Sequence, residues 1–117
     1  MEKLRKHHIS FKNAYRGIFW AFDTQPNFKI HLLLSFIALF LGFILEISGI
    51  EMLLIIFCIV LGLGAEMINT SIEAMTDLIT IEWRKEAKIA KDVSAGMMLV
   101  IAIGTLIVGF YIFIPKS

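Results

Sequence analysis

Three long apolar runs divide the chain, and short polar segments separate them. The runs cover approximately residues 30–45, 52–65 and 93–114. A helix needs about 20 residues to cross the hydrocarbon core of a bilayer. The third run reaches this length by itself, and the first reaches it once its polar start is placed at the membrane surface. The pattern therefore predicts membrane-spanning helices at residues 28–46 and 92–114.

The second run is too short for a membrane span, but its apolar periodicity continues beyond it. No proline or glycine interrupts residues 66–79, and apolar side chains recur there at helical spacing. We predict one long helix over residues 51–79, with an apolar outer half and an amphipathic inner half. A soluble protein would need three helices that are apolar on every side, with too little polar sequence to cover them. The chain is thus expected to be a single all-α membrane domain, residues 1–117, with three spans.

A different pattern precedes the first span. Residues 10–24 alternate apolar and polar positions at helical spacing, and aromatic side chains are dense among them. This pattern is typical of an amphipathic helix that lies on the membrane surface. Ser10 fits the N-cap position. Gln25-Pro26 predicts the end of the helix, because the residue before a proline is pushed out of the helical region.

Basic residues are distributed unevenly around the predicted spans. Lysine and arginine occur in the N-terminal segment and in residues 80–91, whereas residues 46–51 contain neither. Because basic loops stay in the cytoplasm, we expect the N-terminus and the second loop to be cytoplasmic. The composition agrees with a membrane protein, since 58% of the residues are hydrophobic. The formal net charge of +1 gives no bulk attraction to nucleic acid.

Five polar side chains lie on one face of the predicted second helix. At 100° per residue they fall within about a third of its circumference. We call this set the polar stripe: Glu66, Asn69, Thr70, Glu73 and Asp77. Charged groups at membrane depth cost roughly 2.5–3.5 kcal/mol each, so they need a compensating partner, and a divalent cation is one candidate. The other interpretation is a solvated face beyond the membrane, packed against basic residues.

The two glutamates of the polar stripe are too far apart to bind one metal ion together. Glu66 and Glu73 are separated by two turns, or roughly 10 Å along the helix axis. They could not chelate one ion together. Each must therefore do a different job or work with groups from another helix.

Lys91 and Asp92 form a second cluster just before the third span, with Lys88 before them and small residues at 94–96. A helix N-terminus attracts anions such as phosphates, and small residues permit close helix packing. An interface anchor with an N-terminal cap is the alternative interpretation. The sequence contains no Walker-type glycine-rich loop and no His-Arg-Asp catalytic loop.

The polar stripe resembles the signature of the prokaryotic diacylglycerol kinase family, which also contains the undecaprenol kinases. That signature is close to E-x-x-N-[ST]-[AS]-I-E-x-x-x-D, and residues 66–77 match it in order and without a gap. Residues 90–92 match the family's A-K-D. Residues 27–31 look like the N-F-[RKQ]-x-H segment of the undecaprenol-type members. The resemblance covers nearly the whole chain.

This resemblance implies a homotrimer in a bacterial-type cell (inner) membrane, in which each subunit has three transmembrane helices and an N-terminal surface helix. It also implies transfer of the γ-phosphoryl group of MgATP to a lipid hydroxyl at the cytoplasmic interface. Glu66 would be the general base and would contact the lipid together with Phe28 and Ala95. Glu73 would bind the Mg²⁺ ion. The residues implied at the nucleotide are Glu73, Asn69, Asp77, Glu82, Arg84, Lys91 and Asp92.

One position departs from the family pattern. Many members carry a glutamate two residues before the asparagine of the N-F segment, as a second metal ligand, and this chain has Gln25 there. An amide oxygen can coordinate a metal but brings no charge. We therefore expect weaker metal binding, or help from another carboxylate such as Asp23.

Three functional hypotheses follow from the sequence. The leading one is a lipid kinase that acts on undecaprenol or diacylglycerol, and the N-F-K-I-H segment leans towards the polyprenol. The second is a non-catalytic helical scaffold or ion-conducting subunit that uses the same acidic stripe. The third is a pyrophosphate-handling phosphatase, which a histidine pair near the carboxylates would favour. No histidine follows His31, so the third hypothesis is the weakest.

Overall fold

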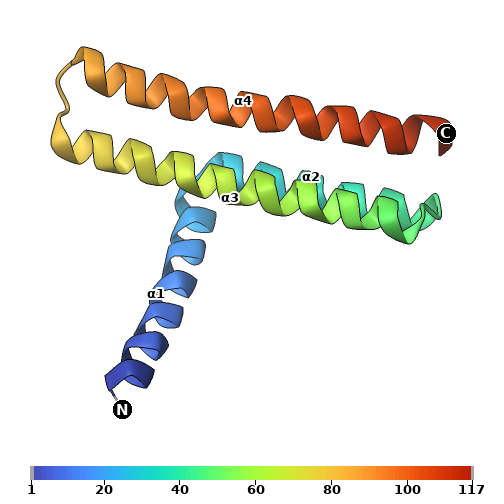
Figure 1. The fold of residues 1–117 in the computed structure, drawn as a ribbon, viewed down its shortest axis with the longest axis horizontal. Helices are drawn as coiled ribbons and strands as arrows, with labels where there is room; N and C mark the ends of the chain where they lie inside the picture. The colour runs from blue at the N-terminus through green and yellow to red at the C-terminus, as the bar shows by residue number, and fades with distance from the viewer. Residues whose placement is uncertain (1, 117) are drawn as a thin grey trace.

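Four α-helices and a final 3₁₀ turn build the fold in the computed structural model, which describes the backbone of residues 2–116 and the side chains of residues 10–116. The elements are α1 (Glu2–Thr24), α2 (Pro26–Ile44), α3 (Gly49–Ile79), α4 (Lys85–Phe113) and η1 (Ile114–Lys116). No strand occurs within residues 2–116. The helices α2, α3 and α4 lie side by side, whereas α1 leaves this bundle at a steep angle (Figure 1).

The three bundle helices are each long and apolar enough to cross a membrane, which confirms the prediction of an all-α protein with three spans. α2 begins at Pro26, because proline suits the first turn of a helix. α4 begins at Lys85, earlier than the predicted start at residue 92. Residues 85–91 read Lys-Glu-Ala-Lys-Ile-Ala-Lys, and these strong helix formers extend the helix beyond its apolar part.

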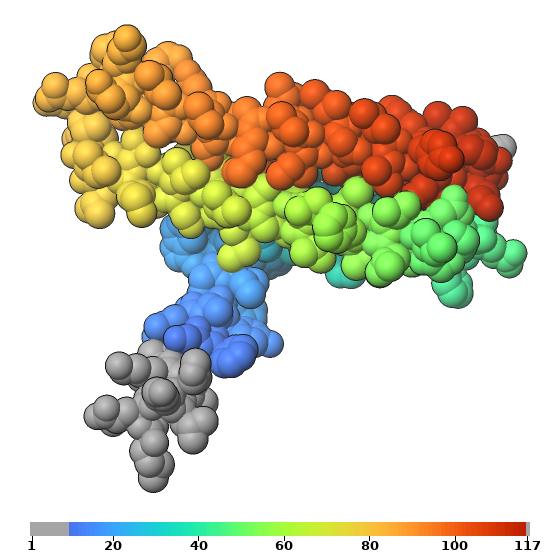
Figure 2. Space-filling view, in the orientation of Figure 1, coloured from blue at the N-terminus to red at the C-terminus, as the bar shows by residue number. Residues whose placement is uncertain are grey.

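α1 starts at Glu2, so Ser10 lies inside the helix, and the prediction that Ser10 caps it is wrong. Residues 2–9 contain no proline or glycine and continue the helical pattern. Gln25 has an extended backbone and separates α1 from α2, as the Gln-Pro pair predicted. Figure 2 shows that α1 stands away from the bundle. Its exposed aromatic side chains are those that an interfacial helix offers to a membrane surface: Phe11, Tyr15, Phe19 and Trp20.

A short turn joins α2 to α3 at the end of the bundle that also holds the C-terminus (Figure 1). The N–H of Ile47 donates to the carbonyl of Gly42 at 3.2 Å, and Glu46 has φ 53°, as in a Schellman motif. A Cβ at Gly42 would approach Ile47 to 2.9 Å, so glycine permits this turn. α3 then begins with a capping box between Ser48 and Glu51. These contacts set α3 antiparallel to α2.

The helix pair α3–α4 forms the most extensive contact of the fold. Among residues 10–116, few apolar side chains are fully enclosed: Ala21, Phe28, Ile55, Ala65 and Ile112. Most other large apolar side chains are exposed, which fits helices whose outer faces meet lipid. Three polar residues of this range are nonetheless buried, namely Glu66, Thr76 and Ser94, and all three lie on α3 or α4.

Candidate active site

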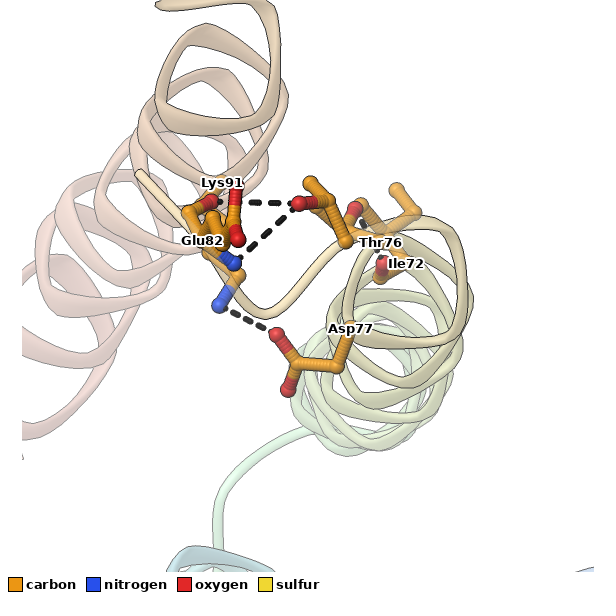
Figure 3. A network of polar contacts seen from close by, with 6 residues as sticks. Ile72, Thr76, Asp77, Glu82 and Lys91 are labelled. Carbon is orange, nitrogen blue, oxygen red and sulfur yellow. Dashed lines mark hydrogen bonds and ion pairs between the residues drawn. The ribbon is translucent and has the colours of Figure 1, made fainter. Parts of the chain in front are cut away.

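The polar stripe of α3 meets α4 close to the loop that joins these two helices. Two side-chain contacts cross between the helices there. The Ser94 hydroxyl donates to Oδ1 of Asn69 at 2.6 Å, and Nζ of Lys91 donates to Oδ1 of Asp77 at 2.7 Å. Figure 3 shows Lys91 reaching from α4 to Asp77 on α3. The structure therefore brings the polar stripe and the cluster before the third span into one site.

Glu66 is the most enclosed carboxylate of the polar stripe, with 5% of its surface exposed. The hydroxyl of Thr70 does not serve this carboxylate, because it donates to the backbone carbonyl of Glu66 at 2.9 Å. Among residues 10–116, no side chain donates a hydrogen bond to the Glu66 carboxylate. Its oxygens are thus available to accept a proton from a substrate hydroxyl.

Glu73 lies on the same face of α3, one turn after Asn69 and one turn before Asp77. Its side chain is exposed. The ammonium group of Lys91, held by Asp77, is also attracted by the Glu73 carboxylate. Glu73 is therefore an accessible carboxylate that could bind a metal ion, and Lys91 on the neighbouring helix could attract the phosphate groups that such an ion carries.

The two metal ligands predicted from the sequence, Gln25 and Glu73, are not linked by a hydrogen bond among the described side chains. Gln25 lies at the N-cap of α2, and its Nε2 donates to the Thr24 hydroxyl at 3.3 Å. No hydrogen bond links Gln25 to Glu73 among the described side chains, and no group of three His, Cys, Asp or Glu residues there could hold a metal. Mg²⁺ commonly uses one or two carboxylates together with substrate phosphates and water. Glu73 fits that kind of site.

A hollow of about 390 Å³ opens between the ends of α3 and α4 at their connecting loop. Four of the residues predicted to contact nucleotide border it in the loop and on α4: Glu82, Arg84, Lys91 and Asp92. Asp77 borders it from α3. Five of the seven candidate nucleotide residues are thus gathered around one opening, although they come from three consecutive segments of the chain, whereas Asn69 and Glu73 do not border it.

Local hydrogen bonds shape the loop beside this hollow. The N–H of Glu82 donates to the Thr80 hydroxyl at 3.1 Å, and this hydroxyl lies 3.3 Å from the Glu82 carbonyl (Figure 3). The Arg84 guanidinium lies 3.7 Å from the Glu82 carboxylate. On α4, Lys88 binds Asp92 at 2.6 Å. Cationic and anionic groups therefore alternate around the rim of the hollow.

The two further residues predicted at the lipid have different environments. Phe28 is 4% exposed, so within one subunit its ring belongs to the core. Ala95 is exposed on α4. Of these two residues, only Ala95 is exposed.

Ser94 is a site residue that the sequence pattern treated only as a small packing residue. It is 3% exposed and bonds directly to Asn69. A signal for it exists in the sequence, because Ser94 follows Lys91 by three residues and so lies on the same face of a helix. Thr76 is also buried, but its hydroxyl donates to the Ile72 carbonyl of its own helix (Figure 3).

Comparisons with known proteins show the family of this chain. The family described as prokaryotic diacylglycerol kinase matches residues 12–113. An undecaprenol kinase of Bacillus subtilis is 40% identical over 115 residues, which are 97% of this chain and 93% of the relative. A diacylglycerol kinase of Synechocystis is 33% identical over 108 residues, 92% of this chain and 62% of the relative. One from Pseudomonas aeruginosa is 31% identical over 84 residues, 72% of this chain and 68% of the relative.

Proposed function

This chain belongs to the prokaryotic diacylglycerol kinase family and is a lipid kinase, and from that premise we propose that it transfers the γ-phosphoryl group of MgATP to the hydroxyl of undecaprenol. The observation that carries this proposal is a pair of contacts, Asn69 with Ser94 and Asp77 with Lys91. They join the polar stripe, which holds Glu66, Asn69 and Glu73, to the segment of α4 that holds Lys91 and Asp92. A helical scaffold has no evident need for these five groups together. Ion conduction does not call for them either.

Two observations support undecaprenol as the acceptor of the phosphoryl group. The relative that shares 40% identity over 97% of this chain is named an undecaprenol kinase, and residues 27–31 have the N-F-K-I-H sequence typical of that type. Diacylglycerol is the second candidate acceptor, because the two other relatives are named diacylglycerol kinases. Both acceptors offer a primary hydroxyl at the surface of the membrane.

Glu66 acts as the general base in this proposal. Its enclosed carboxylate takes the proton of the lipid hydroxyl while the hydroxyl oxygen attacks the γ-phosphorus of ATP. The bond between the γ-phosphorus and the β–γ bridging oxygen breaks, and ADP leaves. Phe28 and Ala95 contribute to the lipid side of the site, with Ala95 providing the open surface on α4.

The nucleotide occupies the hollow at the α3–α4 loop. Phosphoryl transfer depends mainly on positioning and on neutralising charge, so the ammonium of Lys91 and the amide of Asn69 face the phosphates. The rim residues assigned to the nucleotide are Asp77, Glu82, Arg84 and Asp92. Mg²⁺, held by Glu73 with Gln25 as an uncharged second ligand, would neutralise charge on the phosphate oxygens.

The membrane arrangement is part of the same proposal. The basic residues at the N-terminus and at the α3–α4 loop support a cytoplasmic position for both, where ATP is available. α1 then lies along the cytoplasmic surface. The exposed apolar faces of α2, α3 and α4 fit a position within a bacterial-type cell membrane, and the family resemblance supports assembly into a homotrimer there.

The test is to purify the protein in detergent, supply MgATP with undecaprenol or with diacylglycerol in separate mixed micelles, and measure ADP release. We expect release that depends on undecaprenol. Release that depends only on diacylglycerol would change the acceptor but keep the reaction. No lipid-dependent release with either acceptor would support the scaffold or ion-conducting alternative.

A further inference from the structure

The hydroxyl of Ser94 behaves differently from other hydroxyl groups of the helices. Among the hydrogen bonds within residues 10–116, four helical hydroxyls donate to a backbone carbonyl one turn earlier in their own helix: Thr24, Ser35, Thr70 and Thr76. This local bond is the usual choice for serine and threonine inside a helix. Ser94 instead donates across the helix pair to Asn69. Because a hydroxyl has one proton to donate, Ser94 makes this bond in place of the local one.

This bond is shielded from water. Ser94 is 3% exposed and Asn69 is half-buried, and their oxygen atoms are 2.6 Å apart. Water cannot easily replace Ser94 as the donor in such a setting. In this bond the carbonyl corner of the planar Asn69 amide faces α4.

Fixing the carbonyl oxygen of Asn69 also fixes its amino group. The oxygen and the NH₂ group occupy opposite corners of the amide, and the NH₂ group carries two donors. Among the described side chains, no hydrogen bond uses these donors. They remain available at a site where the proposed substrate brings phosphate oxygens, which are acceptors only.

We infer that Ser94 is a positioning residue of the kinase: it holds the Asn69 amide so that the NH₂ group, and not the carbonyl oxygen, faces the phosphates of the nucleotide. This inference rests on the proposed function. Without the Ser94 donor, the amide can rotate by half a turn and present its carbonyl oxygen to the phosphates. The carbonyl oxygen of Asn69 and the phosphate oxygens, which are all hydrogen-bond acceptors, would then face each other. Use of the nucleotide in the reaction would become less efficient.

The first experiment compares Ser94→Ala with the matched control Ser35→Ala. Ser35 also lies in a spanning helix, but its hydroxyl donates to the His31 carbonyl of the same helix at 2.6 Å. For Ser94→Ala we expect kcat/KM for MgATP to fall about three- to tenfold, the range of one neutral hydrogen bond, with the KM for the lipid unchanged. Ser35→Ala should keep both values. Ser94→Cys keeps the shape of the side chain but offers only a weak donor. It should lower kcat/KM for MgATP as Ser94→Ala does. It therefore tests the hydrogen bond even if the smaller alanine side chain impairs folding.

The decisive measurement is a double-mutant cycle with Asn69→Ala. If Ser94 acts through Asn69, Ser94→Ala will cause no further loss of kcat/KM for MgATP in the Asn69→Ala background. Equal losses in both backgrounds would overturn the inference, and so would a Ser94→Ala enzyme that matches Ser35→Ala. The wild type is assayed alongside: absence of lipid-dependent turnover there would reject the proposed function itself, whereas turnover with an additive cycle rejects only the role of Ser94.

Discussion

The two ends of α3 hold their carboxylates in opposite ways. At the first turn, Glu51 accepts a hydrogen bond from the backbone N–H of Ser48 at 2.9 Å and lies 4.0 Å from Nζ of Lys116. Towards the other end, Glu66 and Glu73 receive no hydrogen bond from the side chains of residues 10–116. Glu66 is nevertheless only 5% exposed.

This difference indicates a structural role for Glu51 and chemical roles for Glu66 and Glu73 within a single helix. The charge of Glu51 is satisfied by its own helix cap, so its contribution is to the stability of the turn. An enclosed carboxylate without a donor keeps its oxygens free for a proton, and an exposed one beside Lys91 keeps them free for a metal ion. Asp77 is intermediate, because its ion pair with Lys91 joins the two helices at the site.

A large effect is expected at Glu73. Glu73→Gln removes the carboxylate assigned to the metal and should lower lipid phosphorylation about 10²- to 10³-fold, the usual cost of one group that stabilises transition-state charge. Glu51→Gln is the matched control, because glutamine can also complete a capping box, and it should keep full activity. Equal losses in the two variants would remove the distinction between the ends of α3.

A smaller effect is expected at Lys91. Lys91→Met removes the cation from the hollow and should raise the KM for MgATP about ten- to hundredfold, the range for a hydrogen bond to a charged group. Lys116→Met removes a cation at the opposite end and should leave this KM unchanged. A Lys91→Met enzyme with the wild-type KM would mean that Lys91 serves only its ion pair with Asp77.

The stability of the fold should depend on the capping box at the first turn of α3. Glu51→Ala removes the glutamate half of the capping box and should lower the midpoint of the unfolding transition, measured in detergent micelles. The activity of the folded fraction should not change. A loss of activity without a loss of stability would show that the first turn of α3 also serves the reaction.

The smallest effect is expected at Gln25. Gln25→Glu adds a charged ligand where the family usually has one, and should lower the Mg²⁺ concentration needed for half-maximal activity. A titration of activity with Mg²⁺ at constant ATP measures this. Unchanged or weaker dependence on Mg²⁺ would argue against Gln25 as a ligand, in agreement with its position at the N-cap of α2.

The helices could be predicted from the sequence because their signals are local. Apolar runs of sufficient length, Pro26 at a helix start and the one-sided polar stripe depend on few neighbouring residues. The starts of α1 and α4 were placed too late in the sequence. Both helices extend into polar segments, residues 2–9 and 85–91, where helix propensity continues although the apolar pattern does not.

The contacts between helices could not be predicted in the same way. The pairing of Asn69 with Ser94 and of Asp77 with Lys91 depends on the rotation and register of α3 against α4, which side-chain packing along the whole pair determines. A helical wheel gives the face of each residue but not its partner. For this reason the sequence identified the polar stripe and the Lys91 cluster, but not the bond through Ser94.

The most direct test of the central claim is the rate of phosphoryl transfer by Glu66→Gln. Transfer of the labelled γ-phosphoryl group from MgATP to undecaprenol is measured for this variant and for the wild type, at saturating concentrations of both substrates. We predict that the wild type phosphorylates the lipid and that the variant is slower by about 10²- to 10⁴-fold, the usual contribution of a general base, with an unchanged KM for MgATP. A Glu66→Gln enzyme with the wild-type rate would contradict the assignment of Glu66 as the base.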